Sequence, residues 1–477
     1  PDRRRDQGCG RHRGADGRGA RRAPRGGMSA PPPSGAQTGI DVGVDVGVDV
    51  DVAIVGGGLV GASLALALAP TGLRVALIEG AAPDDARQPS FDDRTTALGN
   101  GTRRIFEALG LWSDIAPHAA AIRCIHVSDA GRFGFARLEA AELGLDAFGF
   151  VATNRTPGAV LRARLAAIPG LQLRMPTRCT AARVHADHVE LHTDGDAAPI
   201  RARLAVAADG AKSLLRETAG LEAETEDYGQ VAVVAHVAAT RPTDGTAYER
   251  FTPQGPFAVL PLAGAAPDSR DHGGGVYGVV WTVASADADR VLAMSDSAYL
   301  AALQQTFGWR AGRFTHVGAR QAYPLKLVRA ARVTAPRVVL VGNAAQGLHP
   351  VAGQGFNLGL RDAATLAELL AEAMSRSTRA APADAASVFD AGAPTLLEAY
   401  AAGRERDRDG ITRFTDGLVK VFGDSRPGVP LARDIGLLLF DLSPSAKQAM
   451  SRLSWGFAAR TPRLARGLAL AVRGESA

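Results

Sequence analysis

Short apolar runs separated by a glycine turn and a helical pattern open the ordered part of the chain. Asp51 to Val55 (DVAIV) and Arg74 to Ile78 (RVALI) predict two buried strands, and the Ala- and Leu-rich segment from Leu59 to Ala69 predicts a helix between them. A strand, a helix and a second strand in this order predict a β-α-β unit.

Two later apolar runs have the same character. Leu204 to Asp209 and Arg337 to Val341 predict buried strands, and a loop and a helix from about Leu358 to Met374 follow the second of them. Parallel strands followed by helices predict a doubly wound sheet, so we expect an α/β fold with a Rossmann-like domain.

Residues 229 to 283 contain alternating and β-rich runs such as VAVVAHVAA and GVYGVVWTV. They predict a mostly antiparallel sheet inserted into the nucleotide-binding domain, with a flexible loop at residues 264 to 275. From about residue 396 the pattern predicts helices. The predicted division is a disordered tail at 1–50, a nucleotide-binding domain at 51–121, 154–222 and 323–395, a substrate domain at 122–153 and 223–322, and C-terminal helices at 396–477.

The positive charge of the chain is concentrated at its N-terminus. Residues 1 to 27 contain nine Arg and three Asp, a net charge of +6, and since the whole chain carries +5 the remainder carries −1. The main argument for a nucleic-acid partner is therefore removed. The first Met is Met28, where we expect translation to start; the alternative is a genuine basic, disordered tail. The stretch has no apolar segment, so it does not predict a secretory signal.

The cysteines and the hydropathy exclude further classes. Cys9, Cys124 and Cys179 have no paired or metal-like spacing, which favours a reducing compartment. Neither H-E-x-x-H nor paired C-x-x-C occurs, and we predict no metal. No run of about 18 apolar residues is present, so we predict no membrane-spanning helix.

A glycine motif follows the first predicted strand. Gly56, Gly58 and Gly61 have the spacing G-x-G-x-x-G, which provides a tight turn, close approach of the backbone to a pyrophosphate and close packing of the next helix. Glu79 ends the second strand, where it is placed to accept both ribose hydroxyls of an adenosine. The alternative is a glycine-rich turn without a ligand, and the motif alone does not separate FAD from NAD.

Asp209 and Gly210 end a predicted strand in the segment ADGAKS. Asp209 is placed to orient backbone or ribose near a cofactor. The alternative is a simple Asp-Gly turn before a capped helix.

The third segment, residues 338 to 361, reads VVLVGNAAQGLHPVAGQGFNLGLR. Gly342 ends its strand, and Asn343 is placed to hydrogen-bond a ribitol hydroxyl. The helix after Asn357 is expected to point its N-terminus at the N1–C2=O edge of a flavin and stabilise the anionic reduced ring. The alternative is an ordinary strand-to-helix loop. The bend that lets the backbone approach a flat ring is expected at Pro350, Gly353, Gln354 and Gly355.

Together these segments resemble the FAD-dependent aromatic hydroxylases of the p-hydroxybenzoate hydroxylase type, and within them the ubiquinone-biosynthesis hydroxylases, over roughly residues 50 to 455. Most members of the wider group have Gly-Asp-Ala-Ala-His where this chain has GNAAQ at 342–346. That departure, with Leu-His-Pro at 348–350, resembles one branch, the 2-octaprenyl-6-methoxyphenol hydroxylases. Similar segments are Glu249-Arg250-Phe251-Thr252, Gly255-Pro256, Phe307-Gly308-Trp309-Arg310 and Ala322-Tyr323-Pro324-Leu325.

The resemblance implies roles for three further residues. Arg94 matches an arginine that lies along the FAD, with a surface salt bridge as the alternative. His349, followed by Pro350, is expected at the reactive face of the ring, where a near-neutral pKa would let it steer a proton. A histidine with a purely structural role is the alternative.

The resemblance also implies a monooxygenase that uses NAD(P)H, FAD and dioxygen to hydroxylate a phenol ring through a flavin C4a-hydroperoxide. Because the chain has no second glycine motif, we expect NAD(P)H to bind transiently at the surface. The implied substrate is a polyprenylated phenol, 2-polyprenyl-6-methoxyphenol. We expect it to contact Phe251, Phe257, Leu260 and Trp281, for which core packing is the alternative.

Three alternatives and two partners complete these expectations. The enzyme could instead hydroxylate another ubiquinone-ring position or a small soluble aromatic, or the chain could be a flavin-binding assembly component without turnover. The apolar tail of the substrate implies a ubiquinone-biosynthesis complex or a membrane surface as partner. We therefore expect a cytoplasmic protein, peripheral at the inner face of the membrane.

Overall fold

The computed structural model describes residues from Gly47 onward, which form one compact unit. The predicted tail up to residue 46 and most of the predicted loop at 264–275 lie outside the described residues. The predicted domain boundaries within the unit stay a prediction. The described ranges are 47–82, 92–195, 198–265, 274–380, 389–454 and 461–470.

A sheet with a parallel centre forms the nucleotide-binding half. Nearly all residues of its central strands are buried, as is typical of parallel strands whose faces are covered by other elements. The order is β18 (Thr334–Ala335), β19 (Val338–Leu340), β11 (Ile200–Ala207), β1 (Val50–Val55), β2 (Val75–Ile78) and β8 (Gln172–Arg174), with β10 (Val189–Thr193) and β9 (Cys179–Val184) pairing from β11.

The second sheet is antiparallel except where β13 runs parallel to β5. Its order is β20 (Gln346–Gly347), β17 (Gln321–Ala330), β12 (Ala223–Ala239), β15 (Gly275–Ala284), β14 (Gly255–Ala265), β13 (Thr246–Thr252), β5 (Cys124–Asp129) and β6 (Phe135–Glu139), with β16 (Phe314–Val317) on β12. A small third sheet consists of β3 (Thr95–Gly99), β7 (Gly149–Thr153) and β4 (Ala120–Ile122). The predicted combination of a Rossmann-like domain and a mostly antiparallel sheet is therefore confirmed.

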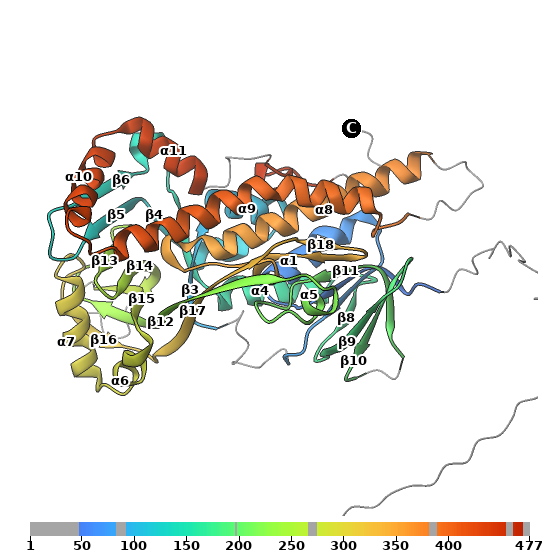
Figure 1. Ribbon diagram of the computed structural model, residues 1–477, viewed down its shortest axis with the longest axis horizontal. Coiled ribbons are helices and arrows are strands. Elements are labelled where there is room, and N and C mark those ends of the chain that lie inside the picture. Colours follow the sequence, from blue (N-terminus) through green and yellow to red (C-terminus); the bar gives the residue numbers. More distant parts are fainter. Residues whose placement is uncertain are drawn as a thin grey trace, which may run out of the picture. The chain divides into compact units, whose positions relative to one another are not determined.

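Helices cover these sheets. Helix α1 is apolar on nearly every side because it lies buried between the first sheet, α4 and α8. Helix α9 runs alongside α8 (Figure 1), and α10 packs on β6. The helices are α1 (Leu59–Leu68), α2 (Asn100–Ala108), α3 (Trp112–Ile115), α4 (Arg155–Ala166), α5 (Leu214–Thr218), α6 (Ala288–Leu292), α7 (Asp296–Phe307), α8 (Gln354–Ala380), α9 (Pro394–Gly423), α10 (Val429–Asp441) and α11 (Pro444–Ser454).

No helix in the described ranges is both long and apolar enough to cross a bilayer. The predicted helix at 358–374 is longer at both ends, since α8 begins at Gln354. The predicted C-terminal helices are confirmed as α9, α10 and α11.

A buried ion-pair network joins α8 to α9. Arg361 donates to Asp407 at 2.8 Å, and Arg404 donates to Asp362 at 2.7 Å while pairing with Asp407 at 2.8 Å. All four side chains are almost completely buried. Burial alone would raise the pKa of Asp407, but Arg361 and Arg404 more than offset it, so that pKa lies below its usual value. Two cations and two anions balance here, which makes removal of any one of them costly.

Replacing Asp407 by Asn leaves Arg361 and Arg404 with one carboxylate between them. We expect the free energy of unfolding to fall by about 3–5 kcal/mol, measured by chemical denaturation. Because the folded-state pKa is lowered, the wild-type stabilisation is present above the pKa of an unfolded Asp and is lost as pH falls through the folded pKa.

The matched control is Asp287→Asn, which removes the exposed pair between Asp287 and Arg290. It should cost less than about 1 kcal/mol. Equal losses in the two variants would contradict a structural role for the network.

Candidate functional site

The turn between β1 and α1 requires glycine for packing reasons. Gly56 has φ +104°, and a Cβ there would lie 2.3 Å from the carbonyl oxygen of Ala208. A Cβ at Gly61 would lie 2.0 Å from the carbonyl oxygen of Gly56. Gly58 is the N-cap of α1 and provides no side-chain cap, so the first N–H groups of the helix stay available to an anion.

Glu79 is held beside this turn. Its carboxylate accepts hydrogen bonds from the backbone N–H of Gly57 and of Ala81, both at 2.7 Å. The carboxylate therefore lies where the sequence predicted a ribose partner, at the end of β2 and against the glycine turn.

Asp209 follows β11 on the other side of the turn. Its Oδ2 accepts from the N–H of Leu214 at 2.9 Å, while its buried Oδ1 has no hydrogen-bond partner among the described residues. Burial raises the pKa of Asp209, although hydrogen bonds from Ser213 and the backbone act in the opposite direction. A buried oxygen of this kind fits a ligand hydroxyl.

The segment after β19 meets the first turn directly. Gly342 has φ +58°, and a Cβ there would lie 3.3 Å from the side chain of Val60 in α1. A Cβ at Gly359 in α8 would lie 2.8 Å from the Cα of Gly342. The structure therefore brings the two predicted cofactor segments together. Asn343 is exposed beside this contact, and its role as a partner of the ribitol stays a prediction.

A sharp bend leads from this loop into α8. Ala352 and Gly353 both have φ +60°, and the N–H of Gly353 donates to the carbonyl of Pro350 at 2.9 Å. Gln354 donates to the carbonyl of Ala352 at 3.0 Å, whereas its buried Oε1 has no partner among the described residues. No atom lies within 4 Å of a Cβ placed at Gly355. The bend thus combines an open backbone with a free amide oxygen.

Asn357 has a different role from the one predicted. Its Oδ1 accepts from Gly99 and Thr102 at 2.9 and 2.6 Å, and its Nδ2 donates to the carbonyls of Ala97 and Gly353, both at 2.8 Å. All hydrogen-bonding positions of this amide are occupied, so it braces the bend against β3 and α2 and its side chain is not free for the cofactor. The helix N-terminus that faces the bend belongs to Gln354.

His349 also differs from expectation. The residue is 1% exposed, and burial lowers the pKa of the His349 imidazole to about 4. Its Nδ1 accepts a hydrogen bond from the N–H of Val351 at 3.2 Å, which leaves the proton of the neutral ring on Nε2. The expected near-neutral titration is therefore wrong, and His349 serves only as a donor.

Arg94 lies at the rim of a small hollow of about 80 Å³. It pairs with Asp92 at 2.6 Å and packs over the ring of Tyr323, 4.5 Å from the centroid. The salt bridge predicted as the alternative thus exists, on a side chain that also faces a cavity.

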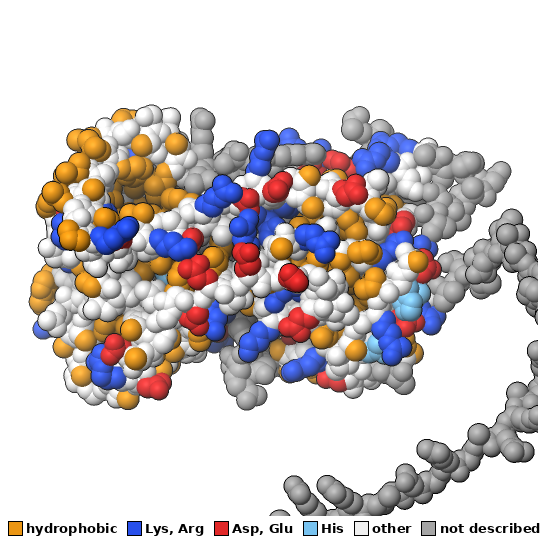
Figure 2. All heavy atoms as spheres, in the orientation of Figure 1, with side chains coloured by type: hydrophobic (Ala, Val, Ile, Leu, Met, Phe, Trp, Pro, Cys, Tyr) orange, Lys and Arg blue, Asp and Glu red, His pale blue; other side chains and the backbone are white. Residues whose placement is uncertain are grey.

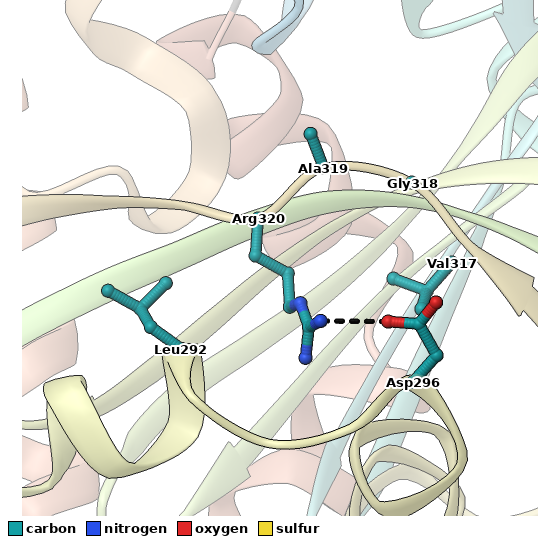
Figure 3. Close-up of a pocket in the computed structure, with 6 residues that line it drawn as sticks. All are labelled: Leu292, Asp296, Val317, Gly318, Ala319 and Arg320. Atoms are coloured by element: carbon teal, nitrogen blue, oxygen red, sulfur yellow. Dashed lines mark hydrogen bonds and ion pairs between the residues drawn. The ribbon is translucent and has the colours of Figure 1, made fainter.

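A larger, open hollow of about 560 Å³ lies next to it (Figure 3). An ion pair between Arg320 and Asp296 at 2.8 Å spans this hollow. No residue of the turn at 56–61 or of the segment at 342–355 lines it. Its polar walls do not suit the tail of a prenylated phenol. The lining residues are Leu292, Asp296, Val317, Gly318, Ala319 and Arg320.

The four aromatic and apolar residues predicted to contact substrate divide between two faces of the sheet. Phe257 and Trp281 belong to the core that packs against Tyr299 of α7. This packing favours the core alternative for these two. Phe251 and Leu260 lie on the opposite face, which turns toward the small sheet and α9.

One cluster in the described ranges has the composition of a metal site, namely His185, His188 and Glu190 on the β9–β10 hairpin. The two imidazole rings stack at 4.5 Å with 9° between their planes, so their in-plane lone pairs do not converge. Arg201 already pairs with Glu190 at 3.1 Å. We interpret the cluster as packing of the hairpin.

Two carboxylates complete the site without belonging to any motif in the sequence. Asp362 accepts from the N–H of Gly342 at 3.1 Å and from Gln346 at 2.6 Å, which fixes the loop after β19. Glu249 reaches the bend from β13, because the N–H of Ala352 donates to its carboxylate. Glu249 lies in a segment that resembles the family, and no spacing pattern marks either carboxylate.

Comparisons with known proteins agree with this geometry. A family model described as FAD binding domain matches residues 49–387. The chain is 37% identical to ubiquinone hydroxylase UbiL of Rhodospirillum rubrum, over 88% of this chain and 93% of that protein. The chain belongs to the FAD-dependent ubiquinone-biosynthesis hydroxylases. FAD is the cofactor of this family, and the unpartnered oxygens of Asp209 and Gln354 fit it.

Two further relatives of this hydroxylase show the breadth of the family. It is 30% identical to 3-demethoxyubiquinol 3-hydroxylase of Escherichia coli, over 85% of this chain and 98% of that one. It is 26% identical to the human mitochondrial ubiquinone biosynthesis monooxygenase COQ6, over 84% and 91% of the two chains. These names do not distinguish a branch, so the resemblance to 2-octaprenyl-6-methoxyphenol hydroxylases stays a prediction.

Solved structures confirm the fold of the hydroxylase. The p-nitrophenol 4-monooxygenase PnpA from Pseudomonas putida superimposes with a TM-score of 0.69 at 21% identity, covering 86% of this chain and 98% of that one. The aromatic hydroxylase CabE from angucycline biosynthesis gives 0.63 at 21% identity, covering 87% and 77%.

Gly355→Ala tests whether the open side of the bend is where FAD lies. Alanine suits a helix start better than glycine by up to about 1 kcal/mol, and the structure leaves room for its methyl group. We therefore expect unchanged or higher thermal stability of the apoprotein, with FAD affinity at least about tenfold weaker by fluorescence titration. Unchanged FAD affinity would contradict this placement.

Proposed function

We propose that this hydroxylase oxidises the ring of a polyprenylated phenol of the 2-polyprenyl-6-methoxyphenol type, with NAD(P)H and dioxygen as co-substrates. The observation that carries the proposal is the contact between the two cofactor segments at Val60 and Gly342. The bend beside this contact meets the face of the antiparallel sheet that contains Phe251 and Leu260, which we call the inner face. A flat ring seated at the bend would face that sheet.

Named residues would hold the cofactor. The turn from Gly56 to Gly61 and the N-terminus of α1 suit the pyrophosphate, and Glu79 suits the ribose. Asp209 and Asn343 suit the ribitol, and the backbone of 353–355 suits the flat ring. When bound, FAD accepts hydride and activates dioxygen for transfer to an electron-rich ring.

The protein's own task is then to orient the phenol and exclude water. The ring of Phe251 stacks on Phe422 of α9, with 3.5 Å between centroids, and this closes one side of the inner sheet face. His349 offers its Nε2–H from the bend, which suits a hydrogen bond to an oxygen of the substrate or cofactor. A dry site of this kind strengthens every such interaction.

An exposed apolar surface supports a prenylated substrate. We call it the α10 surface; Figure 2 shows hydrophobic side chains gathered over α10 and α11 at the upper left. Phe440 of α10 packs in the same cluster as Leu260, which connects this surface to the inner sheet face. Exposed fractions run from 43% to 78%, and the residues are Phe133, Phe135, Leu431, Ile435, Leu439 and Leu442.

A contiguous surface of this kind indicates an apolar partner. We propose that the prenyl tail leaves along the α10 surface toward the lipid that carries it. A transient NAD(P)H site follows from the single glycine motif, because a second resident dinucleotide would need another cradle.

Hydroxylation at another ring position is the second candidate, favoured by the similarity to 3-demethoxyubiquinol 3-hydroxylase of Escherichia coli. Both candidates share the site and differ in how the ring is turned toward the flavin.

Deletion of the gene, with mass analysis of the quinone precursors, separates the candidates. We expect 2-polyprenyl-6-methoxyphenol to accumulate. Accumulation of a precursor that lacks a different ring oxygen would establish the second candidate. A normal quinone pool, when no other hydroxylase gene compensates, would contradict both.

The double variant Leu439→Asp, Leu442→Asp tests the α10 surface. Because burying a leucine contributes about 1.5–3 kcal/mol, we expect at least about tenfold weaker co-sedimentation with phospholipid vesicles and a higher KM for a long-chain substrate in them. Turnover of a short-chain phenol in solution should not change. The control is Leu173→Asp, at an exposed leucine of β8; equal effects in the two would contradict the assignment.

A further inference from the structure

Glu249 lies in the middle of β13, on the face that turns toward the small sheet and the bend before α8. Side chains alternate along a strand, so Ala247, Glu249 and Phe251 share one face. Ala247 packs with residues of the small sheet, and Phe251 stacks on Phe422 of α9. The opposite face carries Tyr248, which packs edge-on against Phe307 of α7. Glu249 is thus on the inner side of the sheet.

The carboxylate of Glu249 touches the bend that precedes α8. The N–H of Ala352 donates to it, and Ala352 itself is held at φ +60° between Pro350 and Gly353. This contact joins the antiparallel sheet to the bend assigned to the flat ring of the cofactor. A phenol bound beside this contact would therefore lie within reach of the carboxylate.

No cation compensates Glu249 among the described residues. Its neighbours in register are Val127 on β5 and Ala258 on β14. From α9, the apolar ring of Phe422 lies nearby, stacked on Phe251. The titratable side chain of the loop is His349, which is neutral. Arg250 points to the other face and does not contribute to the ionisation of Glu249.

Burial raises the pKa of Glu249 to about 8, although the hydrogen bond from Ala352 acts in the opposite direction. The residue as a whole is half-buried. A carboxyl group in this state exchanges a proton near neutral pH, whereas an ordinary surface Glu does not.

A group of this kind can assist ring hydroxylation of a phenol. An ionised phenol is a stronger nucleophile than a neutral one, and a free phenol ionises only near a pKa of about 10. His349 cannot accept the proton, because its Nδ1 lone pair is already used by Val351 and its Nε2 carries hydrogen. The bend therefore provides a donor, and the facing strand provides an acceptor.

We propose that Glu249 is a catalytic residue that accepts the proton of the ring hydroxyl of the bound phenol. The phenol O–H bond breaks as a carboxyl O–H bond forms, and no electrons are exchanged in this step. The proton returns to solvent or product when the ring regains aromaticity. This inference rests on the proposed hydroxylase function.

Glu249→Gln tests it in the FAD-loaded enzyme, with NADPH, dioxygen and a short-chain 2-prenyl-6-methoxyphenol as probe. In the wild type we expect kcat/KM to rise with pH up to a pKa of about 8, the base being active only when ionised. In Glu249→Gln we expect a loss of about 100-fold or more near neutral pH and a rise that continues to about pH 10, where the phenol ionises by itself.

Two variants separate catalysis from structure. Glu249→Asp keeps a carboxylate. It should restore part of the rate and also the rise of kcat/KM with pH that ends near the pKa of the carboxyl group. Glu224→Gln, at an exposed carboxylate on β12, should leave rate and profile unchanged. FAD content and thermal stability should be the same in all variants, because the proposed role is proton transfer.

Each failure points to a different claim. A wild-type enzyme that binds FAD and does not hydroxylate the probe overturns the proposed function and this inference with it. If the wild-type enzyme hydroxylates the probe and Glu249→Gln has the same rate and the same dependence of kcat/KM on pH, the inference alone is overturned. A loss in Glu249→Gln that matches a loss of FAD content assigns the residue a structural role and also overturns it.

Discussion

The carboxylate of Asp362 fixes the loop on which the rest of the site depends. It accepts the N–H of Gly342 and the amide of Gln346, and Arg404 of α9 neutralises it in turn. Buried charges are stable only when they are paired, so α8, α9 and the loop after β19 must be assembled together. That assembly sets Gly342 against Val60 and thereby joins two segments that are far apart in the sequence.

The departure from the usual sequence of the wider group becomes understandable in this context. Gln346 is buried and accepts from Arg408 at 2.6 Å while it donates to Asp362. An amide has both a donor and an acceptor and thus links a cation to an anion without adding charge. Asn343, by contrast, stays exposed and keeps its amide available. Gln346 thus has a structural role, whereas the role proposed for Asn343 is to meet the cofactor.

Local patterns predicted what depends on local geometry. The glycine turn at Gly56 to Gly61 could be identified because its spacing lies within six consecutive residues, although the carbonyl that excludes a Cβ at Gly56 belongs to the distant Ala208. The roles of Asn357 and His349 could not, because a satisfied amide and a lowered pKa both depend on packing between elements distant in sequence. Glu249 escaped for the same reason, since a carboxylate in a strand looks like a solvent-facing residue until its partners are known. Alternation within the sheet also separates Phe257 from Phe251, and this became clear only from which face α7 covers.

The central claim is that one FAD lies across both glycine segments of this chain. Hydrogen–deuterium exchange of the apoprotein with and without FAD tests it most directly. The account predicts that FAD slows exchange at the amides of 57–62 and also at those of 343–355, with no change in β5 and β6, which contain no residue assigned to the cofactor. Protection confined to the first segment, or absent from both, would contradict it.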